Sequence, residues 1–200
     1  MVCLTLPMAD TAVPEVAGVV LAAGAGTRIG SPKALLHTAD GEPWLARAAT
    51  LLRAAGCDPV IAVLGARAAE AAPLVPSGVA VVVADRWADG MAESLRVGLA
   101  AAAETDAVAA LITLVDLPDL PLVVALRVLG DDARASTLRQ AVFDGRPGHP
   151  VLIGRSHWAA VGAEVAGDRG ARSYLVAHGV TEVECGDLFD GRDIDRARYR

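Results

Sequence analysis

Four stretches of strand length are apolar at almost every position, and they constrain the fold more than any other feature of the chain. They cover residues 16–23, 59–64, 79–84 and 107–115. A strand with one face in solvent alternates apolar and polar residues, whereas a continuous apolar run is typical of a strand covered on both faces. We therefore expect four strands that lie between layers of helices.

Segments with helical spacing separate these runs. The first is predicted over residues 43–55, where proline can open a helix and Gly56 can end it. The second spans residues 91–102, with its apolar residues on one face and Asp89 placed to cap its first turn. A third helix is opened by Asp119 and ended by Gly130. It is expected to pack through Leu122, Leu126 and Leu129.

The last third of the chain is less regular. Its expected elements are strands at 138–143 and 150–153 around a loop at 144–148, helices at 157–165 and 169–178, and a strand at 182–185. The order of strands and helices before this region implies parallel strands joined by crossover helices. We therefore predict a single three-layer α/β/α domain over residues 16–200, with a mostly parallel, Rossmann-like sheet. Residues 1–15 are predicted to be an N-terminal extension.

The chain has one lysine, Lys33, among eighteen Lys and Arg residues. A sequence so rich in arginine marks this position as one where a compact ammonium is wanted rather than a planar guanidinium. Lys33 follows the first apolar run and a glycine-rich loop, LAAGAGTRIGSPK at residues 21–33, which also carries Arg28. Backbone N–H groups and cations in such a loop favour the binding of phosphates. A solvated surface lysine is the alternative interpretation of Lys33.

The glycine loop departs from two common phosphate-binding patterns. Gly24 and Gly26 fit the first two positions of GxGxxG, but the third position is Ile29 and Gly30 comes one residue late. The GxxxxGK[ST] pattern of P-loop proteins is also missing from the sequence. Neither a nicotinamide nor a flavin enzyme is therefore the preferred interpretation.

The loop resembles the signature LAAGxGxRxGxxK of MobA-like nucleotidyltransferases, a family with the nucleotide-diphospho-sugar transferase type of fold. The similarity continues through WADGMAESL at 87–95, VDLP at 115–118, GHPVL at 148–152 and GDRGAR at 167–172. These segments occur in the family's order, over roughly residues 16–195. Within the family, the chain is most similar to the CTP:molybdopterin cytidylyltransferase branch, which reads LAAG where the guanylyl branch reads LAGG. Ala23 stands at the position that differs.

Two positions depart from the family pattern. The family usually has glycine before its metal-binding aspartate, where this chain has Val115. The family's tail usually reads DIDTPED, where this chain has DIDRAR at residues 193–198.

The resemblance implies a role for each matching residue. Arg28, Lys33 and Asp116 are the expected catalytic residues, Asp116 and Asp168 the expected Mg²⁺ ligands, and His149 a contact to the substrate. The expected nucleotide-binding residues are Leu21, Ala22, Ala23, Gly24, Ala25, Gly26, Thr27, Arg28, Lys33 and Ser94. An aspartate at the carboxyl end of a parallel strand is also well placed to hold Mg²⁺ against phosphates. Alternatively, Asp116 could form a turn, Asp168 could cap a helix, and Ser94 could be a neutral residue on a helix face. His149 could equally pack at the start of a strand.

Composition excludes several classes of partner. A net charge of −6 and a pI near 5.2 argue against general nucleic-acid binding. The chain has three cysteines far apart in the sequence, Cys3, Cys57 and Cys185, so neither a disulfide framework nor a zinc site is expected. This use of cysteine favours a cytoplasmic location. The apolar segment 97–115 is interrupted by charged residues and is not expected to span a membrane.

The sequence thus predicts a Mg²⁺-dependent enzyme that transfers CMP from CTP to the phosphate of molybdopterin or molybdenum cofactor. A guanylyltransferase, or a transferase with another phosphorylated acceptor, is the alternative within this class. A non-catalytic protein that binds the nucleotide or cofactor and escorts it to a molybdoenzyme or its chaperone is the alternative from another class.

Overall fold

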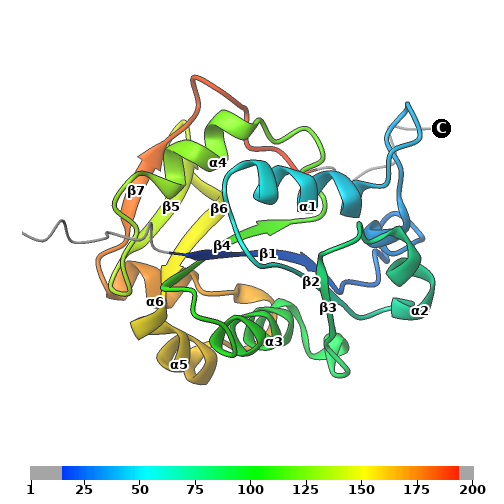
Figure 1. Ribbon diagram of the computed structural model, residues 1–200, viewed down its shortest axis with the longest axis horizontal. Coiled ribbons are helices and arrows are strands. Elements are labelled where there is room, and N and C mark those ends of the chain that lie inside the picture. Colours follow the sequence, from blue (N-terminus) through cyan, green and yellow to red (C-terminus); the bar gives the residue numbers. More distant parts are fainter. Residues whose placement is uncertain (1–14, 194–200) are drawn as a thin grey trace, which may run out of the picture.

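The computed structural model describes residues 15–193, which form one α/β domain (Figure 1). The N-terminal extension predicted for 1–15, apart from Glu15, lies outside the described residues, as do Cys3 and all but the first residue of the tail motif. The described strands are β1 Val16–Ala22, β2 Val60–Leu64, β3 Ala80–Val83, β4 Ala109–Leu114, β5 Leu138–Phe143, β6 Arg146–Gly154 and β7 Thr181–Glu184. The α-helices are α1 Trp44–Ala54, α2 Ala68–Ala71, α3 Met91–Ala103, α4 Leu122–Leu129, α5 Arg155–Glu164 and α6 Arg172–Ala177. Four short 3₁₀ helices in the same part of the chain are η1 Lys33–Leu35, η2 Ala72–Leu74, η3 Trp87–Asp89 and η4 Gly167–Arg169.

The strands described form one sheet in the order β3-β2-β1-β4-β6-β5-β7. β1 lies at its centre and pairs in parallel with β2 on one side and with β4 on the other. β6 runs antiparallel to both of its neighbours, β4 and β5, and the remaining pairs are parallel. The prediction of a mostly parallel sheet in a single domain is therefore confirmed.

Helices cover both faces of the sheet, as Figure 1 shows, with α1 and α4 on one face and α3, α5 and α6 on the other. Successive residues of β1 enter the two cores in turn: Val20 packs toward α1, while Val19 packs toward α3. Every residue of β1 is buried. This burial on both faces explains why the strand is apolar without alternation.

The prediction for β3 is wrong in one respect. β3 is an edge strand that pairs only with β2 within the described sheet, and its Val81 and Val83 are 41% and 48% exposed. Val82 packs against the core on the α3 side. An apolar run therefore did not guarantee cover on both faces, because no helix of the described chain extends over the other face of this edge.

Two details of the helices also differ from the predictions. α4 buries Val124, Ala125 and Val128, whereas two of the three expected leucines, Leu122 and Leu126, are 38% and 45% exposed. The third, Leu129, is partly buried and packs against the core as predicted. Val and Ala are smaller than leucine, and it is this smaller face of α4 that lies against the sheet.

The predicted cap of α3 is wrong as well. Asp89 lies in η3, and the capping position belongs to Gly90, whose φ of 106° is in the region that favours glycine. No side chain bonds to the first turn of α3.

In the last third, β5 has the predicted bounds 138–143. The helices α5 and α6 lie close to the predicted ranges 157–165 and 169–178. The loop predicted for 144–148 is shorter. Only Asp144 and Gly145 form the turn, and the strand β6 begins at Arg146. β6 therefore extends past the part that pairs with β4, and residues 146–149 lie in this extension.

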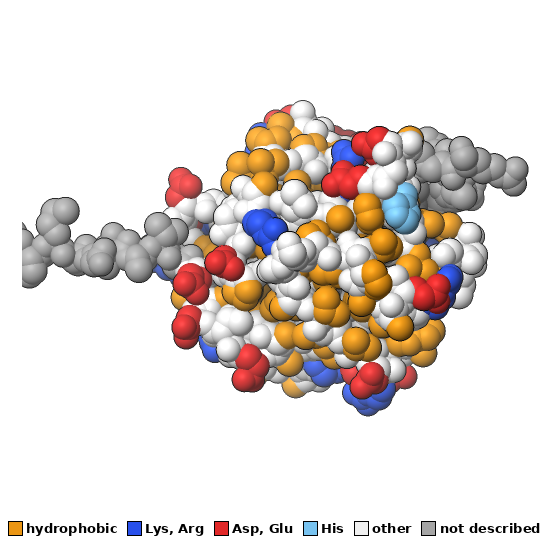
Figure 2. Space-filling model, turned by 45° about the vertical axis from the view of Figure 1, so that its right-hand side comes forward, with side chains coloured by type: hydrophobic (Ala, Val, Ile, Leu, Met, Phe, Trp, Pro, Cys, Tyr) orange, Lys and Arg blue, Asp and Glu red, His pale blue; other side chains and the backbone are white. Residues whose placement is uncertain are grey.

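No described helix is long and apolar enough to cross a membrane. On the face shown in Figure 2, cationic side chains are scattered singly among acidic ones. That face therefore offers no continuous basic surface of the kind that binds nucleic acid.

The packing of α3 on the sheet yields a test of stability. A Cβ at Gly98 would lie 2.8 Å from Val19 Cγ1 and 3.1 Å from Val63 Cγ2. We expect Gly98→Ala to lower the free energy of unfolding by about 1–3 kcal/mol, because the added methyl overpacks the core. Gly162→Ala in α5 is the control, since its Cβ would meet only Arg96 Cγ, at 3.8 Å. Alanine's higher helix propensity should raise its stability by up to about 1 kcal/mol. Urea unfolding of both variants measures the two changes, and a Gly98→Ala protein as stable as the parent would refute this account.

Candidate nucleotide site

The glycine loop leaves the carboxyl end of β1 and folds back on itself. The carbonyl of Gly26 accepts hydrogen bonds from the N–H groups of Ile29 and Gly30, both at 2.9 Å. A Cβ at Gly26 would lie 1.9 Å from the carbonyl oxygen of Ser31, so this position requires glycine. A Cβ at Gly24, by contrast, would meet nothing within 4 Å. The loop is therefore closed on one side and open on the side where a ligand can approach the backbone.

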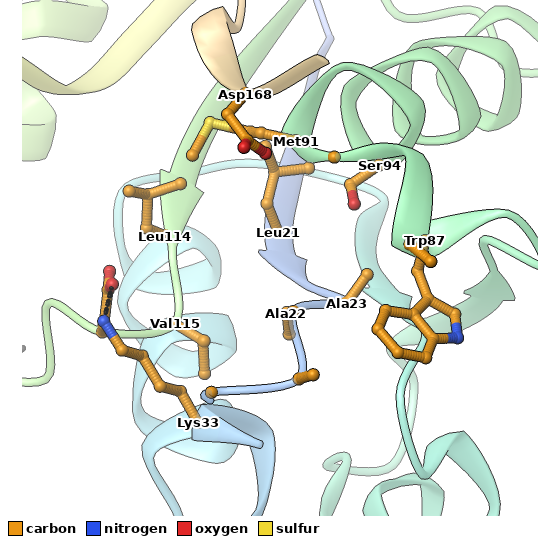
Figure 3. Close-up of a pocket in the computed structure, with 16 residues that line it drawn as sticks. Leu21, Ala22, Ala23, Lys33, Trp87, Met91, Ser94, Leu114, Val115 and Asp168 are labelled. Atoms are coloured by element: carbon orange, nitrogen blue, oxygen red, sulfur yellow. Dashed lines mark hydrogen bonds and ion pairs between the residues drawn. The ribbon is translucent and has the colours of Figure 1, made fainter. Parts of the chain in front are cut away.

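A cavity of about 330 Å³ lies beside this loop (Figure 3). Its walls come from the carboxyl ends of β1 and β4, the start of α3, and the short helices η1, η3 and η4. The residues that line it are Leu21, Ala22, Ala23, Gly24, Ala25, Gly26, Lys33, Trp87, Ala88, Gly90, Met91, Ser94, Leu114, Val115, Asp116 and Asp168. This is the edge where ligands of open α/β sheets bind.

Lys33 and Asp116 form an ion pair at one side of the cavity. The Lys33 Nζ lies 2.6 Å from Asp116 Oδ2, and the two side chains are only 17% and 13% exposed. Figure 3 shows Lys33 opposite Trp87 across the cavity. The second oxygen of the carboxylate, Asp116 Oδ1, is buried and accepts no hydrogen bond. A buried carboxylate oxygen without a donor is costly unless another partner satisfies it.

Most of the predicted nucleotide-binding residues meet at this cavity, but two do not. Ser94, which is 6% exposed, faces it from the first turns of α3. Thr27 and Arg28 lie in the exposed part of the loop and are not among the described residues that line the cavity. Val115, which replaces the family's usual glycine, is 5% exposed, and its N–H donates to the Leu21 carbonyl at 3.2 Å. Valine at this position therefore continues the hydrogen bonding of β4 to β1.

Asp168 reaches the cavity from η4 and does not cap a helix. The cap position of the following helix α6 is Ala171, so the interpretation of Asp168 as its N-cap is wrong. η4 packs closely against Gly90, at the start of α3. A Cβ at Gly90 would lie 2.7 Å from Asp168 Oδ1 and 2.6 Å from the Gly167 backbone. Glycine at this position thus allows Asp168 to approach the nucleotide side of the cavity.

The carboxylates of this cavity suit a metal that also binds phosphate. Within residues 15–193, no group of three or more His, Cys, Asp or Glu residues could hold a metal ion by itself. Mg²⁺ usually takes one or two carboxylates and completes its shell with waters and substrate phosphates. Asp116, with its unsatisfied Oδ1, and Asp168 are the two carboxylates that line the cavity. The residues therefore fit a divalent cation that arrives with a polyphosphate.

His149 lies in a second, smaller cavity of about 180 Å³. This cavity shares Leu21 and Met91 with the first one, so the two adjoin. Burial lowers the pKa of His149 to about 4, although the charge of Asp193 opposes the shift. The imidazole is therefore neutral near pH 7. Gln140 lines the same cavity, and its Nε2 donates to the Gly148 carbonyl at 3.2 Å.

A charged network missed by the sequence analysis supports two walls of the first cavity. Glu93 is buried in α3 and accepts hydrogen bonds from Arg86 at 3.1 and 3.3 Å and from Arg96. Arg96 also donates to the carbonyls of Gly162 and Val165, each at 3.0 Å. Arg86 directly precedes Trp87, and Val165 lies shortly before Asp168. The spacing of Glu93 and Arg96 on one helix predicts an ion pair, but no local pattern indicates that Glu93 is buried.

Two cysteines and two histidines lie away from the nucleotide cavity. Cys57 and Cys185 are buried, and burial raises the pKa of the Cys57 thiol to about 12. His157 lies 2.8 Å from the hydroxyl of Tyr174, and His178 stacks on the same ring. None of these five residues lines the nucleotide cavity.

The chain is similar to several known proteins. A model of the MobA-like NTP transferase domain matches residues 18–183. Nicotine blue oxidoreductase from Paenarthrobacter nicotinovorans is 37% identical over 198 residues, which cover 94% of this chain and 96% of that protein. A probable molybdenum cofactor guanylyltransferase from Rhodopirellula baltica is 34% identical over 113 residues, or 56% of this chain and 54% of that protein. The solved complex of Rv0371c from Mycobacterium tuberculosis H37Rv with manganese is 30% identical, with a TM-score of 0.68 and coverage of 86% of this chain and 88% of that one.

The neutral state of His149 predicts how stability depends on pH. Between pH 6.5 and about 4 the unfolded chain binds a proton at His149 that the folded protein does not bind. The free energy of unfolding should therefore fall with decreasing pH in this window, by up to about 1.4 kcal/mol per pH unit from this residue. His149→Gln should remove that part of the pH dependence, whereas His37→Gln, at an exposed histidine, should keep it. Urea unfolding at several pH values measures the slopes, and equal slopes in the parent and His149→Gln would contradict the assignment.

Proposed function

The chain belongs to the MobA-like NTP transferase family, and from this premise we propose that it transfers CMP from CTP to a phosphorylated acceptor and releases pyrophosphate. Nucleotidyl transfer is the reaction class of the family. The base and the acceptor are the specific part of the proposal. The main support for the proposal is that the open glycine loop, Lys33 and Asp116 lie together at one cavity.

The triphosphate is proposed to lie along the glycine loop. Gly24 leaves open space there, and Lys33 supplies a flexible cation with three donor positions. Several negative charges come together when a phosphate attacks a triphosphate, so catalysis consists mainly of positioning and charge neutralisation. Arg28 is proposed to contribute from the exposed part of the loop.

Asp116 and Asp168 are proposed to hold Mg²⁺. Nucleotidyltransferases of this type depend on divalent metals, and the related Rv0371c was solved with manganese. When bound, the metal would neutralise phosphate charge and polarise the reacting phosphoryl group. The unsatisfied Oδ1 of Asp116 supports this assignment, because a cation would provide the partner that the buried oxygen lacks.

The acceptor is proposed to occupy the smaller cavity, where His149 and Gln140 can form hydrogen bonds. A neutral imidazole and an amide suit an uncharged heterocycle, and Arg172, which lines the same cavity, adds one cation. The phosphate of the acceptor would then point toward the first cavity. A phosphorylated pterin, molybdopterin or molybdenum cofactor fits this description, and delivery of the product to a molybdoenzyme or its chaperone would follow.

A second candidate activity is hydride transfer, favoured by one observation. The relative with 37% identity, which this chain matches over almost its full length, is named an oxidoreductase. The departure of the glycine loop from GxGxxG at Ile29 weighs against a dinucleotide cofactor. Assays of NADH and NADPH oxidation with planar heterocycles separate this activity from pyrophosphate release.

The proposed function is tested by pyrophosphate release with each NTP, Mg²⁺ and a phosphorylated pterin. We expect Lys33→Ala to reduce turnover by about a hundredfold or more, because one preorganised charge donor to the transition state is lost. Lys33→Arg should also be impaired, since a planar guanidinium does not reproduce the point contact of an ammonium.

Arg53→Ala is the control, because Arg53 is an exposed cation on α1 that donates to the Ser77 carbonyl away from the cavity. Wild-type kinetics in Lys33→Ala would refute the role of Lys33. Nucleotide binding without pyrophosphate release from any NTP would favour the non-catalytic escort instead.

The choice of base gives a further prediction. Ala23 lies at the foot of the cavity, where a Cβ at Gly65 would come within 2.7 Å of Ala23 Cβ and 2.6 Å of Trp87 Cβ. Ala23 lines the cavity, and its methyl group takes up space that glycine would leave open, which favours the smaller pyrimidine. We expect a preference for CTP over GTP, and a weaker preference in Ala23→Gly, with about 1–3 kcal/mol at most from one methyl group.

The measurement is kcat/KM for CTP and GTP in both proteins. Ala25→Gly is the matched control, because Ala25 lines the same cavity and should not change the ratio when truncated. A native preference for GTP would overturn the cytidylyl assignment and leave nucleotidyl transfer in place.

A further inference from the structure

We propose that the Lys33 ammonium competes with divalent metal for Asp116. As a result, the site binds free metal weakly and takes up metal together with a polyphosphate. The inference rests on the proposed function of the same cavity. It adds a property that the reaction does not require, namely that the site binds metal only weakly when no polyphosphate is present.

The first support is the state of the Asp116 carboxylate. Its Oδ2 accepts a hydrogen bond from the Lys33 ammonium at 2.6 Å, and its Oδ1 is buried without a partner. While the pair persists, Oδ2 is held by the ammonium and Oδ1 is shielded by its burial, so an ion that enters from the cavity cannot reach either oxygen directly. Metal binding requires the carboxylate to turn or the ammonium to leave.

Charge gives the second support. A divalent cation bound to Asp116 would lie close to the Lys33 ammonium, because both would contact one carboxylate. Both side chains of the pair are less than a fifth exposed, so solvent screens this repulsion only partly. Asp168 is the other carboxylate that lines the cavity, and it comes from η4 rather than from the β4 end. A single free carboxylate is a poor site for Mg²⁺, which is reluctant to lose its waters.

A polyphosphate removes both obstacles. It offers oxygens to the Lys33 ammonium, whose flexible stem can turn from Asp116 toward the glycine loop. It also brings oxygen ligands and negative charge for the metal. Binding of one polyphosphate thus frees Asp116 from Lys33 and also supplies ligands for the metal.

The test measures Mn²⁺ binding by electron paramagnetic resonance with no nucleotide and no acceptor present. We expect Lys33→Met to bind Mn²⁺ about tenfold more tightly than wild type or better, because the competing charge is gone. Lys33→Gln, which can still donate a hydrogen bond to Asp116, should show the same gain. Lys33→Arg should bind as weakly as wild type, and Arg53→Met controls for the loss of a cation elsewhere on the surface.

Two further measurements identify the ligand and the folded state. Adding Asp116→Asn to Lys33→Met should abolish the gain, and Mn²⁺ should raise the Tm of Lys33→Met more than that of wild type. The inference is overturned if folded Lys33→Met and Lys33→Gln bind Mn²⁺ no more tightly than wild type, or if the gain survives Asp116→Asn. Absence of pyrophosphate release in the wild-type protein would instead refute the proposed function and leave the Mn²⁺ comparison valid.

Discussion

The burial of β1 on both faces and along both edges is the constraint on which the rest of the molecule depends. Its residues pair with β2 and β4 and enter the two cores in turn, so each position needs an apolar side chain or glycine. A polar group within this strand would be left without water and without a partner. Within this part of the chain, polar groups that could contact a ligand therefore begin where β1 ends and the glycine loop starts.

The pairing of β1 with β4 explains how groups distant in sequence form one site. Lys33 and Asp116 are 83 positions apart, but each follows one of two adjacent parallel strands. Once the sheet forms, both chain segments leave it at the same edge. The ion pair then joins the loop after β1 to the loop after β4, and removing Lys33 would leave the largely buried Asp116 carboxylate without its cationic partner.

The sequence was sufficient for features set by local chemistry and insufficient for those set by distant contacts. The runs that became β1, β2 and β4, and the glycine loop with Lys33, were predictable because burial on two faces and phosphate binding leave direct marks on composition. The exposure of Val83 was not, since an apolar run does not reveal that its strand is at an edge. The position of Asp168 depends on the contact of η4 with Gly90, across 77 residues of chain, and no local pattern encodes it.

The reversed direction of β6 divides the site into two parts with different freedom to change. The loops that follow β1 and β4 line the larger cavity and are tied to buried strands. His149 reaches the site from the start of β6, just after a two-residue turn from β5. A hairpin can be lengthened or resequenced at its tip without disturbing the central strands. The reversed strand thus allows the smaller cavity to change its lining while the larger cavity stays fixed by the central strands.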